Sequence, residues 1–124
     1  MAKVLKQIYY LDIAINRCFG GWKLSYNAIQ WLKNHGMTNE NFKNWIEYKD
    51  RHNPILIECI NSLGKEASSM GECGPESCIQ IYTLTNENIY FIQDWDGMER
   101  IWTPNTCPWI TAPYNRIYEY YVDG

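Results

Sequence analysis

The sequence has little positive charge and no long apolar run. Its 124 residues hold eleven Lys and Arg against fourteen Asp and Glu, a formal net charge of −3. The basic residues are dispersed, so we expect no duplex nucleic acid as a partner, because such a partner requires a basic stripe. No apolar run approaches the roughly 18 residues of a membrane span, and residues 1–4 do not open a signal-peptide pattern. We therefore expect a cytoplasmic protein without a membrane partner.

Patterns that hold metals or form disulfides are also missing. The five cysteines are an odd number with irregular spacing, none forms a Cys-x-x-Cys pair, and the two histidines follow no zinc-finger pattern. We expect free thiols, no disulfide in a reducing cytosol, and neither a metal nor another cofactor. One alternative stays open, which is a zinc site built from Cys73, Cys78 and Cys107.

Two helices have clear start and stop signals. Ser25 is a suitable N-cap for a helix over residues 26–35, and Gly36 supplies a left-handed terminator. Asn53 and Pro54 are typical of a helix start, and an apolar stripe then continues to Gly64. A third, short helix after Asn39 is a weaker prediction, because only a few apolar residues there recur at helical spacing.

The remaining segments predict strands. β-branched and aromatic residues are dense in residues 8–16, 78–84, 89–95 and 98–103, and Asp-Gly at 96–97 is the preferred dipeptide of a two-residue hairpin turn. The fold class is therefore α+β, an antiparallel meander sheet with two short amphipathic helices packed on one face. We expect residues 1–124 to form a single α+β domain, with residues 113–124 as an edge strand or an interface tail.

Three segments carry a family pattern. Residues 16–25 read Asn-Arg-Cys-Phe-Gly-Gly-Trp-Lys-Leu-Ser, residues 51–54 read Arg-His-Asn-Pro at a helix start, and residues 95–99 read Trp-Asp-Gly-Met-Glu. In this order they resemble a family of small, mostly uncharacterised proteins of tailed phages and large DNA viruses. Asn53 stands where the family usually has Asp, and the tail after Thr103 differs from the family. The resemblance implies a viral accessory protein in the host cell cytoplasm and supplies no activity.

Several residues suit an anionic, nucleotide-like ligand. Two adjacent glycines before a helix can expose backbone amides to an anion, and Arg51 and His52 precede the second helix. Aromatic residues are abundant, with 6 Trp and 10 Tyr, and tryptophans beside arginines stack bases and hold phosphates. The predicted ligand-binding set is Phe19, Gly20, Gly21, Trp22, Arg51, His52, Trp95, Arg100 and Trp102, and Trp109 suits the same pocket.

No catalytic constellation stands out, so we interpret the chain as a non-enzymatic binding protein. The resemblance and the aromatic content favour a homo-oligomer that sequesters a small nucleotide-like host immune signal, as an anti-defence sponge. Two alternatives stay open. One is a protein–protein inhibitor of a host defence enzyme that uses the aromatic residues 42–48. The other is a small nucleotide hydrolase that uses Asp94, Asp96 and Glu99.

Overall fold

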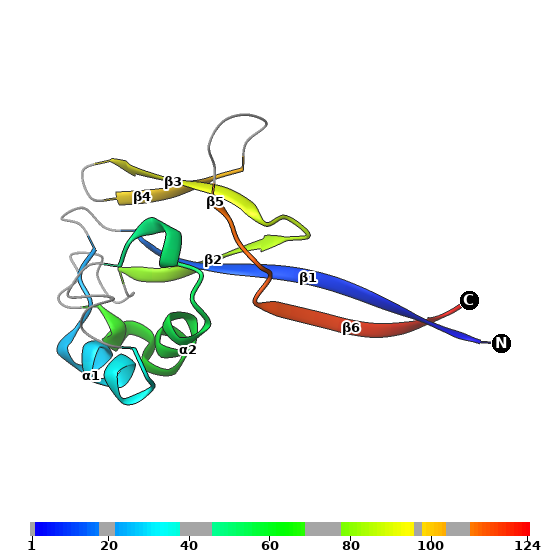
Figure 1. Ribbon diagram of the computed structural model, residues 1–124, viewed down its shortest axis with the longest axis horizontal. Helices are drawn as coiled ribbons and strands as arrows, with labels where there is room; N and C mark the ends of the chain where they lie inside the picture. The colour runs from blue at the N-terminus through cyan, green and yellow to red at the C-terminus, as the bar shows by residue number, and fades with distance from the viewer. Residues whose placement is uncertain (1, 18–21, 38–45, 69–77, 96–97, 104–109) are drawn as a thin grey trace.

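The computed structural model describes residues 2–17, 22–37, 46–68, 78–95, 98–103 and 110–124. They form two antiparallel three-stranded sheets and two α-helices (Figure 1), which confirms the α+β class. One sheet has the order β2-β1-β6, with β2 Ile79–Thr85, β1 Lys3–Asn16 and β6 Arg116–Asp123. The other has the order β4-β3-β5, with β4 Met98–Trp102, β3 Ile89–Trp95 and β5 Ile110–Thr111. The helices are α1 Tyr26–Asn34 and α2 Pro54–Leu63, and two short 3-10 segments are η1 Tyr48–Asp50 and η2 Gly64–Ala67.

The β2-β1-β6 sheet lies between the helices and the second sheet (Figure 1). Successive side chains of a strand point to opposite faces, so β1 serves two cores. Its residues Leu11, Ile13 and Ile15 pack with Tyr90 and Ile92 of β3 in the core between the sheets. On the other face, Ala14 packs with buried residues of α1 and α2. The second half of β1 is therefore the central strand of the molecule.

Both helices begin where the sequence predicted, and α1 ends one residue earlier than predicted, at Asn34. The Ser25 hydroxyl accepts a hydrogen bond from the Ala28 amide at 3.0 Å, and Gly36 follows α1 with φ +98°. The Asn53 side chain accepts one from the Ile55 amide at 2.8 Å. Gly64 ends α2 with φ +57°, a conformation that side chains disfavour. The apolar stripe of α2 is buried, so its amphipathic face holds the helix on the sheet.

The predicted meander is divided between the two sheets. β2 pairs with β1, from Tyr10 opposite Thr85 to Asn16 opposite Ile79. β3 pairs instead with β4 and with β5, a two-residue strand that the sequence did not predict. The segment between β2 and β3 therefore crosses from one sheet to the other. The reason is the length of β1, whose fourteen residues offer both edges to partners, β2 on one side and the predicted edge strand β6 on the other.

β1 starts earlier than predicted, and its first half leaves the body of the molecule. Residues 3–10 pair with residues 116–123 of β6, and Tyr10 is the only one of them that also pairs with β2 among the described residues. This two-stranded ribbon, here called the arm, extends beyond the helices and the second sheet, and both chain ends lie near its tip (Figure 1). At its base, the Arg116 guanidinium binds the Asp12 carboxylate at 2.8 and 3.1 Å.

The expectation of no disulfide is wrong. Cys78, at the start of β2, is disulfide-bonded, and its partner lies outside the described residues, as do Cys73 and Cys107 of the alternative zinc site. Cys59 of α2 is a free, buried thiol. No group of three or more His, Cys, Asp and Glu residues in the described ranges could hold a metal ion. Nor does the described part of the chain contain a helix long and apolar enough to cross a membrane.

Candidate functional site

The outer side of the β3–β4 hairpin carries a row of large exposed side chains. The register sets Phe91 opposite Trp102, Gln93 opposite Arg100, and Trp95 opposite Met98. Residues opposite each other in a sheet point to the same side, so all six share one surface. We call this surface the aromatic face. The next residues along β3, Tyr90 and Ile92, point the other way and are buried in the core between the sheets.

The aromatic face holds its indoles open to solvent in a defined arrangement. Trp95 is 64% exposed and Trp102 is 52% exposed. The Trp102 indole N–H donates to the Gln93 side-chain oxygen at 2.8 Å, which fixes the ring beside the centre of the hairpin. Gln93, Asp94, Trp95 and Arg100 line a hollow of about 210 Å³. That volume is smaller than a pocket enclosing a drug-sized ligand, so this hollow suits one flat ring lying against the sheet.

A buried ion pair fixes the hairpin from behind. Glu99 of β4 points inward, and its two carboxylate oxygens accept from the Arg51 guanidinium at 2.5 and 2.9 Å. One of these oxygens also accepts from the backbone N–H of Asn16 at 2.7 Å. Arg51 additionally donates to the backbone oxygens of Ile46 and Ala14. The hairpin that carries the aromatic face is thereby attached to the end of β1 and to the segment around η1.

Arg51 and Trp22 therefore lie elsewhere than in an open pocket. The Arg51 guanidinium carbon is 3.8 Å from the centre of the Trp22 ring. The sequence analysis predicted that these two residues act together, and the structure does bring them into contact. Arg51 is fully buried and Trp22 is 5% exposed, so their contact stacks a cation on an indole inside the protein. Neither presents a surface to a ligand in this conformation.

His52 contacts two other residues, Tyr90 and Asn115. Its ring nitrogen Nδ1 lies 3.2 Å from the Tyr90 hydroxyl, and the backbone oxygen of His52 accepts from Asn115 at 2.9 Å. Burial lowers the pKa of His52, an effect that nearby Asp50 partly opposes. Phe19, Gly20, Gly21 and Trp109 lie outside the described residues. Of the predicted ligand-binding set, the structure thus gathers Trp95, Arg100 and Trp102 on one surface, and Trp22 with Arg51 in the interior.

Three members of the aromatic face, Phe91, Gln93 and Met98, are absent from the predicted ligand-binding set. Phe91 and Gln93 share the side of β3 that carries Trp95, which the alternation of the strand already indicated. The Asp-Gly turn would have set them opposite Trp102 and Arg100, because a two-residue loop fixes the register of a hairpin. The signal was present in the sequence, and combining the two patterns would have found them.

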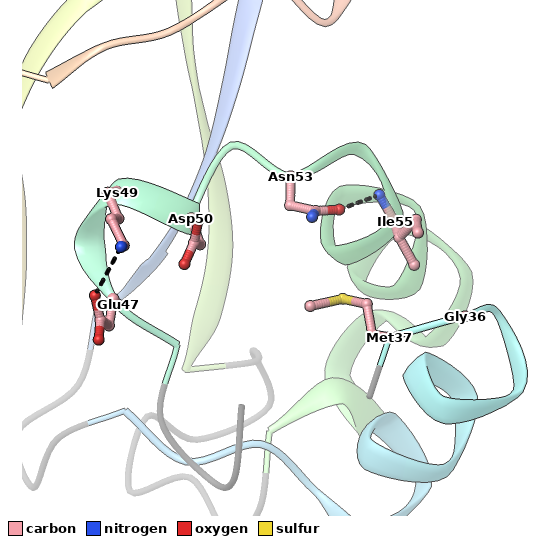
Figure 2. Close-up of a pocket in the computed structure, with 7 residues that line it drawn as sticks. All are labelled: Gly36, Met37, Glu47, Lys49, Asp50, Asn53 and Ile55. Carbon is pink, nitrogen blue, oxygen red and sulfur yellow. Dashed lines mark hydrogen bonds and ion pairs between the residues drawn. The ribbon is translucent and has the colours of Figure 1, made fainter. Parts of the chain in front are cut away.

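A second hollow, of about 470 Å³, lies between the end of α1, η1 and the start of α2 (Figure 2). Three of its polar side chains, Glu47, Lys49 and Asn53, already bond to other residues of the lining. Lys49 lies 3.6 Å from the Glu47 carboxylate, and Asn53 caps α2 through the Ile55 amide. Glu47 and Asp50 add two carboxylates to the lining. These two carboxylates outnumber the single cation of the lining, Lys49, so this hollow is unfavourable for the anion that the sequence predicted beside the second helix.

The carboxylates of the hydrolase alternative have other neighbours. Glu99 is buried in the ion pair with Arg51, and Asp94 accepts from the Tyr48 hydroxyl at 3.3 Å. Burial and the nearby charges of Asp94 and Glu99 raise the pKa of Tyr48, so this hydroxyl keeps its proton. Asp96 lies outside the described residues, as do residues 42–45 of the inhibitor alternative.

Comparison with known proteins gives no family model, no curated protein and no solved structure that matches the chain.

Proposed function

We propose that this chain is a binding protein that holds a small, flat, anionic ligand of the nucleotide class on its aromatic face. The observation that carries the proposal is the exposure of Trp95 and Trp102 around Arg100 on a hairpin fixed by a buried ion pair. Large indoles left open to water on one rigid surface favour a stacking partner. Stacking contributes about 1–3 kcal/mol per base and does not depend on which base is bound.

The charge of the chain favours a small ligand over a nucleic-acid strand. A strand-binding groove needs several cations along the backbone of its ligand. The net charge of −3 is unsuitable for a polyanion. One phosphate needs far less, and the planar guanidinium of Arg100 can bind it with two parallel hydrogen bonds. Trp95 and Arg100 line the same hollow, so a ring that stacks on the indole would bring its phosphate close to the guanidinium.

Sequestration without turnover is the second part of the proposal. The Glu99 carboxylate is fully buried and bound to Arg51, so it is occupied with holding the hairpin. The resemblance to small phage and viral proteins supports a role for such a binder, which is the removal of a nucleotide-like signal of host defence. A protein of this kind would return its ligand intact when it is denatured, whereas a hydrolase would return products.

The test is calorimetric titration with a panel of mononucleotides and cyclic dinucleotides. Trp95→Ala and Trp102→Ala should each weaken binding about five- to 150-fold, the equivalent of one stacking contact. Arg100→Ala should weaken it by a similar factor, because the charge-assisted hydrogen bonds to the phosphate are lost. Tyr26→Ala is the matched control, because Tyr26 is a 74% exposed aromatic residue on α1, and its affinity should equal the wild type.

Two results would overturn the proposal. One is no heat of binding from any member of the panel at millimolar concentration. The other is binding that the three aromatic-face variants leave unchanged. Mass spectrometry of the ligand released by denaturation then separates binding from hydrolysis, since only intact ligand agrees with sequestration.

A further inference from the structure

The arm exposes apolar side chains along its whole length. Among them are Val4, Leu5, Ile117, Tyr118, Tyr120 and Tyr121, all of which are exposed. An isolated two-stranded ribbon is marginally stable in water, and soluble proteins usually cover apolar patches of this kind. No described element lies over this part of the ribbon (Figure 1). The arm therefore has the character of an interaction element.

One edge of the arm has no partner strand among the described residues over a defined stretch. Asn86, the residue after β2, bonds to the same edge of β1. Its backbone N–H donates to the Tyr9 carbonyl at 2.7 Å, and its side chain accepts from the Tyr9 amide at 3.0 Å. Backbone groups of successive residues point to opposite sides of a strand. The Tyr10 carbonyl accepts from Asn115 on the β6 side, so the N–H and C=O groups of Lys3, Leu5 and Gln7 point away from β6.

The pattern of side chains along this edge fits a second copy of itself. Antiparallel pairing about a two-fold axis at Leu5 sets Leu5 opposite Leu5 and Lys3 opposite Gln7, so no like charges meet. This pairing includes Lys3, Leu5 and Gln7, whose outward backbone groups Asn86 does not bond. The outer edge of β6 is less suitable, because two of its outward positions are Glu119 and Asp123. A two-fold pairing centred on Glu119 sets two carboxylates against each other, and like charges directly opposite are destabilising.

We propose that the arm is a dimerisation element, in which β1 of a second copy pairs antiparallel with β1 at residues 3–7. The pairing joins the two β2-β1-β6 sheets through their arms, and it is isologous, so it closes at two copies. The aromatic faces lie on the other sheet of each copy and stay open in this dimer. The inference does not depend on the ligand proposed above.

The test uses the oligomeric state of the full chain, with two proline variants that differ only in the edge they block. Leu5 and Tyr121 are direct cross-strand neighbours, and their N–H groups point to opposite edges of the arm. A proline at either position removes an outward N–H without removing a hydrogen bond between β1 and β6. Wild type and Tyr121→Pro should sediment at twice the chain mass of 14.7 kDa, and Leu5→Pro should sediment at the chain mass.

Hydrogen exchange of the wild type supplies the second measurement and needs no variant. The Leu5 and Gln7 amides should become protected as protein concentration rises, while the Lys6 and Ile8 amides, which face β6, stay protected throughout. A wild type that stays monomeric over the whole concentration range of the exchange experiment overturns the proposal. A Leu5→Pro variant that is still a dimer also overturns it, and so does a Tyr121→Pro variant that is a monomer. Either result would assign the contact to β6 or to the faces of the arm.

Discussion

Arg51 and Glu99 form a bidentate ion pair in which both side chains are fully buried. The pair joins three segments that are distant in sequence, because it also contacts the carbonyl of Ala14 and the amide of Asn16 at the end of β1. Trp22 stacks on the guanidinium. The ion pair therefore lies where the helices, the central strand and the aromatic hairpin meet, and it holds the hairpin in place.

Breaking this pair on one side should destabilise the fold strongly. Glu99→Gln leaves the Arg51 cation buried without its counter-charge, and Arg51→Met leaves the Glu99 carboxylate buried without a cation. Each change should lower the free energy of unfolding by about 3–5 kcal/mol. The double variant Arg51→Met/Glu99→Gln should lose less than the sum of the two, because it leaves no unpaired charge in the interior. Urea unfolding followed by tryptophan fluorescence measures all three values.

The control for this prediction is an exposed pair on the same segment. Lys49 and Glu47 lie 3.6 Å apart with side chains 70% and 65% exposed. Lys49→Ala should change the free energy of unfolding by less than about 1 kcal/mol, since water screens such a pair. If Glu99→Gln were as mild as Lys49→Ala, the ion pair would not be what holds the hairpin.

The helices were predictable from sequence because their signals are local. The cap of α1 is Ser25 and that of α2 is Asn53, and each acts on an amide two or three residues away. The faces of β3 were predictable for the same reason, since alternation needs only the strand itself. Local patterns of this kind require no knowledge of which segment lies nearby in space.

The pairing of distant segments was not predictable in the same way. Nothing near Arg51 in the sequence indicates its partner, because that partner is Glu99, 48 positions along the chain. Likewise β2 suits either β1 or β3 by composition, and the length of β1 decides the outcome. Because Arg51 is buried, our proposal places the anion site on the exposed residues of the β3–β4 hairpin and not at the start of α2.

Gln93 should matter for ligand binding more than for stability. Its side-chain oxygen holds the Trp102 indole at 2.8 Å on the surface, where water can replace a lost hydrogen bond. Gln93→Ala should therefore leave the free energy of unfolding within about 1 kcal/mol of the wild type. It should weaken nucleotide binding about two- to tenfold, because the indole loses its fixed orientation. Calorimetry and urea unfolding on the same preparation separate the two effects, and equal affinity in Gln93→Ala would show that the orientation of Trp102 is unimportant.

Cys59 and Cys78 should differ in their reaction with iodoacetamide. Burial raises the pKa of the Cys59 thiol to about 11, so this thiol should stay unmodified in the native protein at pH 8. In denaturant without reductant Cys59 should react, whereas Cys78 should react only after reduction, because it is disulfide-bonded. Peptide mapping by mass spectrometry follows both residues and identifies the partner of Cys78. Alkylation of Cys78 in denaturant alone would show that the disulfide is absent.

His52 should make the protein less stable as the pH falls below neutrality. Its folded pKa lies below the ordinary value because the ring is buried, so the unfolded chain binds the proton more readily. The stabilisation is complete above the unfolded pKa of about 6.5 and is lost as the pH falls from there towards the folded pKa. The melting temperature measured from pH 7.5 to pH 5 should therefore drop in the wild type and drop less in His52→Asn. A His52→Asn profile identical to the wild type would assign the pH dependence to other groups.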